Sequence, residues 1–525
     1  MSGIETAFNH VFINAEIITM DPACPKAARV AVKGGRIALV DDASGAVSGV
    51  LNGETTQIVD CRGRTVLPGF IDAHCHMAAY AESLVAMDAS PIEGPYCIAE
   101  IQARVRDCST RIPAGCWIRG KGYNEFYISE KRHPNRRDLD AAAPSHPVKL
   151  THRSGHAHVL NSLGLKACGI DAGSGDPPGG IIDRDPETGE PTGILYGMHR
   201  YLSGKIPAID PSELDRGLVH ANKKLLSYGI TSVQDATCSN SLKQWNRFHA
   251  WKERRLLNPR LTMMQGTESF AMHGKNAFVS RLPDTDLRPG GIKIMAERVT
   301  GSLCPPQDAL NELVASIHMA GRQVAVHALE EPVVKAAVEA IRQALRLHPR
   351  TDSRHRIEHC SVCSPALLKR LAELGCMVVT QPTFLFSEGE RYLEKIPDED
   401  LPHLYPLAAM IESGLRVAAG ADAPIADPNP MTGIGAAVTR LSKEGRRLPQ
   451  QGIDLDRALR MYTVDAAAAN FEEDIKGSIA VGKLADFVVL DQNPFRVSLE
   501  KIRDIRVIMT VIGGEIVWRD PDAWD

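Results

Sequence analysis

The sequence lacks the excess of positive charge that nucleic-acid-binding proteins and membrane-surface proteins carry. Its 525 residues have a formal net charge of −4, which argues against a nucleic-acid footprint or a polybasic membrane contact. No apolar run approaches the length of a transmembrane helix. The first residues contain neither a basic n-region nor an apolar h-region, so we expect no signal peptide. These absences predict a cytoplasmic protein with no nucleic-acid or membrane partner.

Cysteine is also sparse, with twelve residues scattered over the chain without the spacing of a disulfide framework. Free thiols in a reducing compartment fit this pattern best. The Cys-x-x-Cys sequence at 360–363 has no thioredoxin-like surroundings, which disfavours a redox role. Cys75 lies between two histidines on a predicted strand and should face away from them, so we expect it to pack in the core.

Apolar residues make up 44% of the chain, enough for a large core. Short strand-like runs separated by turns occupy residues 10–60, and similar runs follow residue 485, with Gly-Gly hairpin signals in both regions. We therefore predict that the two ends of the chain, residues 1–66 and 476–525, form one small β-sandwich domain.

Between the two ends the pattern becomes strand, loop and helix, repeated. This alternation predicts a parallel sheet. At this length the simplest arrangement is a sheet that closes on itself, so we predict a (β/α)8 TIM-like barrel over residues 67–475. Residues 80–215 fit the repeat poorly, because a helix is followed by Gly- and Pro-rich loops such as 173–180. We predict that they form an insertion over the barrel mouth.

Histidine and aspartate residues close several of the predicted strands. A short apolar run ends in His74 and His76, which share one face of a strand and can supply half of a metal's ligands. His327, His359 and Asp422 close later strands. Catalytic residues of a barrel lie at these C-terminal strand ends, so the set predicts a metal site. Imidazole and carboxylate donors suit Zn, Mn, Fe, Co or Ni.

Lys293 lies inside another apolar strand, where an unpaired ammonium is expensive to bury. One interpretation is a lysine that extends to solvent or pairs with Glu297. The other is that desolvation keeps the amine neutral, so that it takes up carbon dioxide. The resulting carbamate is an anionic ligand able to bridge two cations.

Short motifs at many positions carry a resemblance to a known family. They lie at 69–76, 154–162, 191–195, 229–235, 326–328, 357–359, 381–382, 420–424 and 482–490. With this set the sequence resembles the amidohydrolase superfamily, and most closely its amidohydrolase-3 branch of YtcJ-like proteins and N-substituted formamide deformylases. The resemblance implies hydrolysis of an amide or amide-like C–N bond in a small organic substrate, by an enzyme that is commonly a homodimer.

The resemblance also implies a two-metal site, most simply with two Zn. His74, His76 and Asp422 would hold the more buried metal, and His327 and His359 would hold the other. Carboxylated Lys293 would bridge the two, and a shared hydroxide would attack the substrate. Asp422 would act as the general base and pass the proton to the departing nitrogen. His156 would contact the substrate or its oxyanion.

Two segments depart from the branch pattern on the expected substrate side. The Glu that often follows the 191–195 motif is replaced by Tyr196-Gly197, and residues 296–305 lead quickly into the next helix. The resemblance in the motifs therefore does not imply that this protein acts on formamides. We expect substrate contacts from His156, Glu297 and Glu330.

Two alternatives remain open. The sequence His327-Ala328-Leu329-Glu330 resembles the mononuclear deaminases and triazine hydrolases, in which the Glu is a general acid beside one metal. Glu330 and Glu331 also suit the first turn of a helix, where the dipole favours negative charge. A scaffold or signalling role would follow from loss of the ligands, but this sequence retains every one of them.

Overall fold

The chain folds into two units, of which the structure, a computed structural model, describes residues 8–42, 56–91, 96–274, 278, 283, 285–299, 301–449 and 451–523. The first unit contains Met1–Met77 and Ala221–Asp525, and the second contains Ala78–His220.

An eight-stranded parallel sheet forms the centre of the first unit. In order along the sheet its strands are β8 (Phe70–Cys75), β15 (Ile230–Asp235), β16 (Arg260–Gly266), β17 (Leu287–Met295), β20 (Val324–Ala328), β21 (Arg356–His359), β22 (Met377–Thr380) and β23 (Arg416–Ala419). Nearly all of their residues are buried, as expected for parallel strands covered on both faces.

The two edge strands of this sheet meet just beyond their C-terminal ends. The amide of Asp422 donates to the carbonyl of His74 at 2.7 Å, and the amide of His76 donates to the carbonyl of Ala423 at 2.9 Å. Cys75 and Ala423 form an isolated parallel bridge. The sheet is thus a nearly closed barrel, which confirms the predicted (β/α)8 fold.

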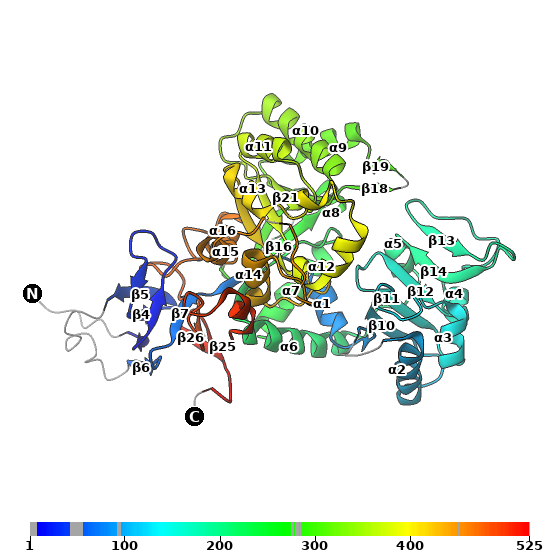
Figure 1. The fold of residues 1–525 in the computed structure, drawn as a ribbon, viewed down its shortest axis with the longest axis horizontal. Helices are drawn as coiled ribbons and strands as arrows, with labels where there is room; N and C mark the ends of the chain where they lie inside the picture. Colours follow the sequence, from blue (N-terminus) through cyan, green and yellow to red (C-terminus); the bar gives the residue numbers. More distant parts are fainter. Residues whose placement is uncertain are drawn as a thin grey trace, which may run out of the picture. The chain divides into compact units, whose positions relative to one another are not determined.

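Helices follow the barrel strands along the chain. They are α6 (Pro211–Ser227), α7 (Leu242–Glu253), α8 (Thr267–His273), α9 (Gln307–Met319), α10 (Glu331–Leu347), α11 (Pro365–Glu373), α12 (Thr383–Lys395), α13 (Leu407–Glu412), α14 (Pro430–Thr439), α15 (Leu455–Met461) and α16 (Val464–Ala468). Helices α9 and α10 lie side by side (Figure 1). Both also pack against β20. None of the helices in the described ranges is both long enough and apolar enough to cross a bilayer.

The N-terminal segment contributes strands to two further sheets in the first unit, and the C-terminal segment contributes strands to one of them, which confirms the predicted β-sandwich. One sheet has the order β5 (Arg36–Asp41), β4 (Arg29–Lys33), β1 (His10–Ile13) and β6 (Gln57–Asp60). The other has the order β26 (Glu515–Arg519), β25 (Val507–Ile512), β24 (Phe487–Leu490), β7 (Thr65–Pro68), β2 (Glu16–Ile18) and β3 (Lys26–Ala27). Their inner faces share one apolar core, in which the rings of Phe12 and Phe487 meet edge to face at 4.7 Å.

The second unit is more ordered than its sequence indicates. It contains a six-stranded mixed sheet in the order β13 (Ile181–Arg184), β14 (Pro191–Tyr196), β12 (Ala157–Leu160), β11 (Val148–His152), β10 (Ile118–Tyr123) and β9 (Met87–Asp88). Helices α1 (Met77–Ser83), α2 (Ile98–Arg111), α3 (Arg136–Ala142), α4 (Ser162–Cys168) and α5 (His199–Ser203) complete its chain path.

This sheet corrects the expectation of a helix followed by loops. Its strands escape detection because they are short and carry polar residues on one face. The strand β10, for example, has the sequence Ile-Arg-Gly-Lys-Gly-Tyr and buries only three of its six residues. The Gly- and Pro-rich stretch at 173–180 does lie outside regular structure, before β13. The placement of the insertion over the barrel mouth stays a prediction.

The thiols agree with the sequence interpretation. All twelve cysteines are free, including Cys360 and Cys363. Cys75 is buried, and its Sγ lies 3.6 Å from the carbonyl of Gln234 on the neighbouring strand. It therefore packs between strands, as expected.

Candidate metal centre

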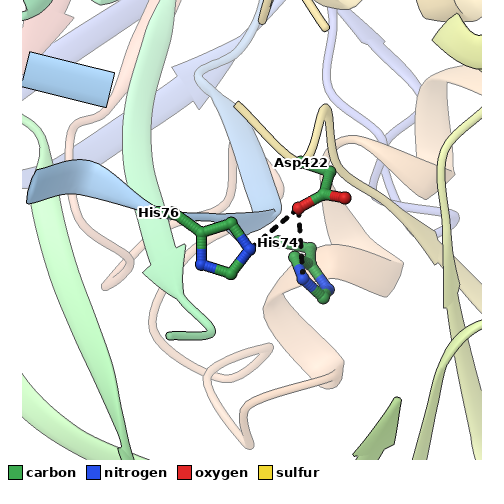
Figure 2. Close-up of side chains that lie close together, drawn as sticks. All are labelled: His74, His76 and Asp422. Atoms are coloured by element: carbon green, nitrogen blue, oxygen red, sulfur yellow. Dashed lines mark ion pairs between the residues drawn. The ribbon is translucent and has the colours of Figure 1, made fainter. Parts of the chain in front are cut away.

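Three side chains meet where the barrel sheet closes. Asp422 Oδ1 lies 2.9 Å from His76 Nε2 and 3.6 Å from His74 Nε2. Figure 2 shows both imidazole rings turned toward this one carboxylate. The side chain of His74 is fully buried, whereas 26% of the His76 side chain is exposed. The three residues form the one cluster of metal-ligating side chains found within the described part of the chain.

The backbone at the ends of β8 and β23 brings these side chains together. His74 and His76 are two residues apart, so both point to the same side of the strand end. Asp422 lies three residues beyond β23 with a φ of 57°, the left-handed conformation that side chains other than glycine rarely adopt. Asp72 ties the two strand ends together, because its Oδ1 accepts hydrogen bonds from the amides of His74 and Ala421, both at 3.1 Å.

Gly420 permits this close approach. A Cβ at position 420 would lie 2.5 Å from the His74 amide nitrogen and 2.7 Å from Asp72 Oδ1. Both atoms belong to the junction of the two strands, so an added methyl group must push β23 away from β8.

We expect Gly420→Ala to lower the free energy of unfolding by about 1–3 kcal/mol, as overpacking of a buried site does, and to weaken metal binding. Urea unfolding of the purified variants measures the first effect. Gly175→Ala is the control, since no atom lies within 4 Å of its added Cβ. Equal stability of the two variants would contradict the steric argument.

Three further predicted ligands lie near the cluster. Lys293 Nζ is 3.4 Å from His74 Nε2 and is fully buried in β17. The ring centroid of His359, at the end of β21, is 4.8 Å from that of His74. The His327 ring, on β20, is 4.5 Å from the His359 ring. The structure therefore brings all six predicted metal ligands to one end of the barrel.

Burial sets the charge state of these groups. It lowers the pKa of His74 well below its ordinary value, and nearby Lys293 lowers it further, so that the imidazole is neutral. Burial also lowers the pKa of His359. For Lys293, burial lowers the pKa of the amine while Glu358 opposes the change. Burial alone would raise the pKa of Asp422, but His76 and His74 bring it below its ordinary value. The result is a neutral His74 imidazole beside an ionised Asp422 carboxylate.

Hydrogen bonds hold the histidine rings through their Nδ1 atoms. His74 Nδ1 lies 2.5 Å from Glu358 Oε2, and His76 Nδ1 lies 2.9 Å from Thr237 Oγ1. His359 Nδ1 lies 2.7 Å from Gln381 Oε1. The sequence interpretation assigned no role to these three partners. Glu358 and Gln381 fall inside the 357–359 and 381–382 motifs. The sequence therefore marked both residues, but it did not show which side chains they contact.

The donor set suits a divalent cation. Two ligand atoms about 2 Å from a tetrahedral cation are about 3.3 Å apart, and the distances of 2.9 and 3.6 Å from Asp422 Oδ1 to the two imidazoles lie on either side of that value. No well-aligned hydrogen bond from the described residues reaches this buried oxygen. An anionic oxygen facing two imidazole nitrogens fits zinc or a similar metal.

The remaining predicted residues have different surroundings. Glu330 precedes α10, its side chain is 59% exposed, and it lies 3.7 Å from Arg298. This environment is that of a residue at a helix start and gives no support to a general acid. Glu297 is partly exposed in β18 (Glu297–Val299). His156 is exposed in the second unit, so its contact with the substrate stays a prediction.

Comparisons with known proteins extend the resemblance over nearly the whole chain. A model of the amidohydrolase family matches residues 57–518. An N-substituted formamide deformylase from Arthrobacter pascens is 30% identical, covering 96% of this chain and 97% of its own. The putative amidohydrolase YtcJ of Bacillus subtilis is 26% identical, covering 88% and 90% of the two chains. A crystal structure of a metal-dependent hydrolase from Pyrococcus horikoshii superimposes with a TM-score of 0.73 at 20% identity, covering 93% of this chain and 99% of its own.

Proposed function

Since the chain belongs to the amidohydrolase family and is a metal-dependent hydrolase acting on C–N bonds, we propose that it cleaves an amide or amide-like bond of a small organic molecule. The observation that carries this proposal is the cluster of His74, His76 and Asp422 at the closure of the barrel sheet. Catalytic residues of such barrels come from the C-terminal strand ends, which is where these three residues lie.

The residues of the cluster have separate tasks in this proposal. A divalent metal, when bound, lowers the pKa of water and polarises a carbonyl group. His74 and His76 would hold the metal through their Nε2 atoms. Asp422 would also hold it, and its second oxygen would accept a proton from water and deliver it to the departing nitrogen. A pKa below the ordinary value keeps the Asp422 carboxylate ionised, as a ligand of a cation must be.

We further propose a second metal position, held by His327 and His359, with carboxylated Lys293 between the two. The full burial of Lys293 and its pKa below the ordinary value support an amine that is neutral enough to react with carbon dioxide. The short distances among the His74, His359 and His327 rings support a shared site. Metal analysis that finds one ion per chain, together with unmodified Lys293, would exclude this part of the proposal.

The substrate class is proposed only as far as the amide bond. The deformylase from Arthrobacter pascens acts, by its name, on N-substituted formamides, but Tyr196-Gly197 replaces a Glu expected beside the substrate. A panel of N-substituted formamides, N-acyl amino acids, aromatic amides, carbamates and cyclic imides would identify the class. Hydrolysis of formamides alone would assign this chain the activity of its relative.

Removal of the metal tests the proposal as a whole. Dialysis against a chelator should abolish hydrolysis and lower the midpoint of thermal unfolding, because a metal that binds only the folded state stabilises it. Zn, Mn, Co, Fe or Ni added back singly should restore both. Protein shown by elemental analysis to be free of metal, yet fully active, would contradict the proposed function.

A further inference from the structure

A charged network lies inside the barrel directly beneath the metal cluster. Arg356 and Glu358 are two residues apart on β21, so they share the face that points toward the barrel interior. Both side chains are fully buried, and Arg356 Nε donates to Glu358 Oε1 at 2.7 Å. Barrel interiors are ordinarily filled by branched apolar side chains, so a buried arginine here is unusual.

Hydrogen bonds to two other strands hold the Arg356 side chain of this ion pair in place. Arg356 Nη1 donates to Gln234 Oε1 on β15 at 2.6 Å, and Arg356 Nη2 donates to the carbonyl of Ala73 on β8 at 2.9 Å. Arg356 Nη2 also donates to Glu358 Oε2 at 3.1 Å. The guanidinium thus connects three strands and leaves the Glu358 carboxylate little freedom to rotate.

Stability does not explain the pair. Burying two charges removes them from water, and replacing a buried ion pair by apolar residues of similar size is often neutral or stabilising. The contact of the pair with His74 points to its function, since His74 Nδ1 lies 2.5 Å from Glu358 Oε2. Metal-binding histidines commonly donate their second ring N–H to a carboxylate, which sets the tautomer and orientation of the ring.

We propose that Glu358, held by Arg356, is the positioning residue that keeps the proton of His74 on Nδ1 and directs its Nε2 lone pair at the metal. This inference rests on the proposed metal function. It adds a role for two residues that do not themselves bind the metal. Glu358 accepts the Nδ1 proton, and Arg356 supplies the donors that fix the carboxylate in place.

Glu358→Gln tests the tautomer directly. Arg356 presents only donors and makes its shorter contact, 2.7 Å, with Oε1, so we expect the amide oxygen of the new side chain at that position and its NH2 group at the Oε2 position, facing His74. That NH2 group needs an acceptor, which forces the His74 proton from Nδ1 to Nε2, the atom required for the metal. An equivalent change beside a catalytic histidine produces the wrong tautomer while leaving the geometry intact. We expect the variant to bind Co²⁺ about 10–100-fold more weakly.

A double variant separates positioning from stability. Arg356→Met with Glu358→Leu replaces the ion pair by apolar side chains but takes a donor from Gln234 Oε1 and from the carbonyl of Ala73. We therefore expect the metal-free protein to fold and to unfold at a temperature close to that of the matched control, which also loses a buried ion pair with polar partners. His74 Nδ1 then has no carboxylate partner, and Co²⁺ affinity should fall by about 10–100-fold. The matched control is Glu472→Leu with Lys476→Met, which removes a buried ion pair of 2.9 Å whose other partners include Asn470, Ser232 and Arg288.

Two measurements decide between the outcomes. Competition with a chelator gives the Co²⁺ dissociation constant of each metal-free protein, and the visible absorption of bound Co²⁺ reports the ligand geometry. Weaker binding and an altered spectrum in both Glu358 variants, with wild-type values in the control, is the expected result. Wild-type affinity and spectrum in folded Glu358→Gln would overturn the inference and leave the proposed function standing. A wild-type protein that binds no Co²⁺ would overturn both.

Discussion

Asp422→Asn is expected to lower kcat/KM by a factor of about 10²–10⁴, the usual contribution of a general base. The amide cannot accept the proton of the attacking water, and it is a weaker metal ligand than a carboxylate. Loss of the negative charge also leaves His74 and His76 without the anionic oxygen at 3.6 and 2.9 Å. Steady-state hydrolysis of whichever amide proves to be a substrate, measured at saturating metal, gives the ratio.

The control for this variant is Asp427→Asn, five residues farther along the same loop. Asp427 is largely exposed and pairs with Lys224 at 2.6 Å, so its replacement should leave kcat/KM unchanged. Metal content has to be measured in both proteins, because it separates loss of the base from loss of the ion. Full activity of a metal-replete Asp422→Asn protein would refute the proposed mechanism.

Lys293→Met is expected to reduce the metal content from about two ions per chain to about one, since the bridging ligand is removed. Activity should fall by on the order of 10²-fold, the effect of removing one electrostatic stabiliser from an active site. Stability should change little, because an apolar side chain of similar length replaces a buried amine. Elemental analysis, steady-state kinetics and thermal unfolding measure the three quantities.

A second lysine provides the contrast. Lys252, in α7, donates to the carbonyls of Leu257, Asn258 and Pro259 at 3.0–3.1 Å. Lys252→Met leaves those carbonyls without this donor, so the variant should lose stability and keep its metal content and activity. If Lys293→Met retained two metals and full activity, Lys293 would be a buried structural lysine.

The residues that we propose as metal ligands could be identified from the sequence because they lie within or just after short apolar runs. His74 and His76 are two residues apart at a strand end, and His359 and Asp422 end later strands of the same kind. Lys293 was recognisable because a charged residue interrupts an apolar strand. The sheet of the second unit was not predictable, since strands such as β10 alternate buried residues with charged residues and glycine.

The residues that form hydrogen bonds with the proposed metal ligands could not be predicted from the sequence either. Glu358 and His74 are 284 positions apart in the chain, and nothing in either motif states that the two side chains meet inside the barrel. The same holds for His359, the last residue of β21, and Gln381, the residue after β22. Such pairs depend on the register between strands, and a shift of one residue would turn each side chain to the other face.

The sequence by itself determined the kinds of groups available and the strand ends that carry them, because burial patterns and ligand chemistry are local properties of the chain. Only the tertiary structure decided that β8 and β23 approach closely enough at Gly420 to place His74, His76 and Asp422 around one point. It also decided which side chains hold those ligands in place. Closing a barrel brings together residues that are hundreds of positions apart, and the distances between them follow from packing rather than from any local pattern.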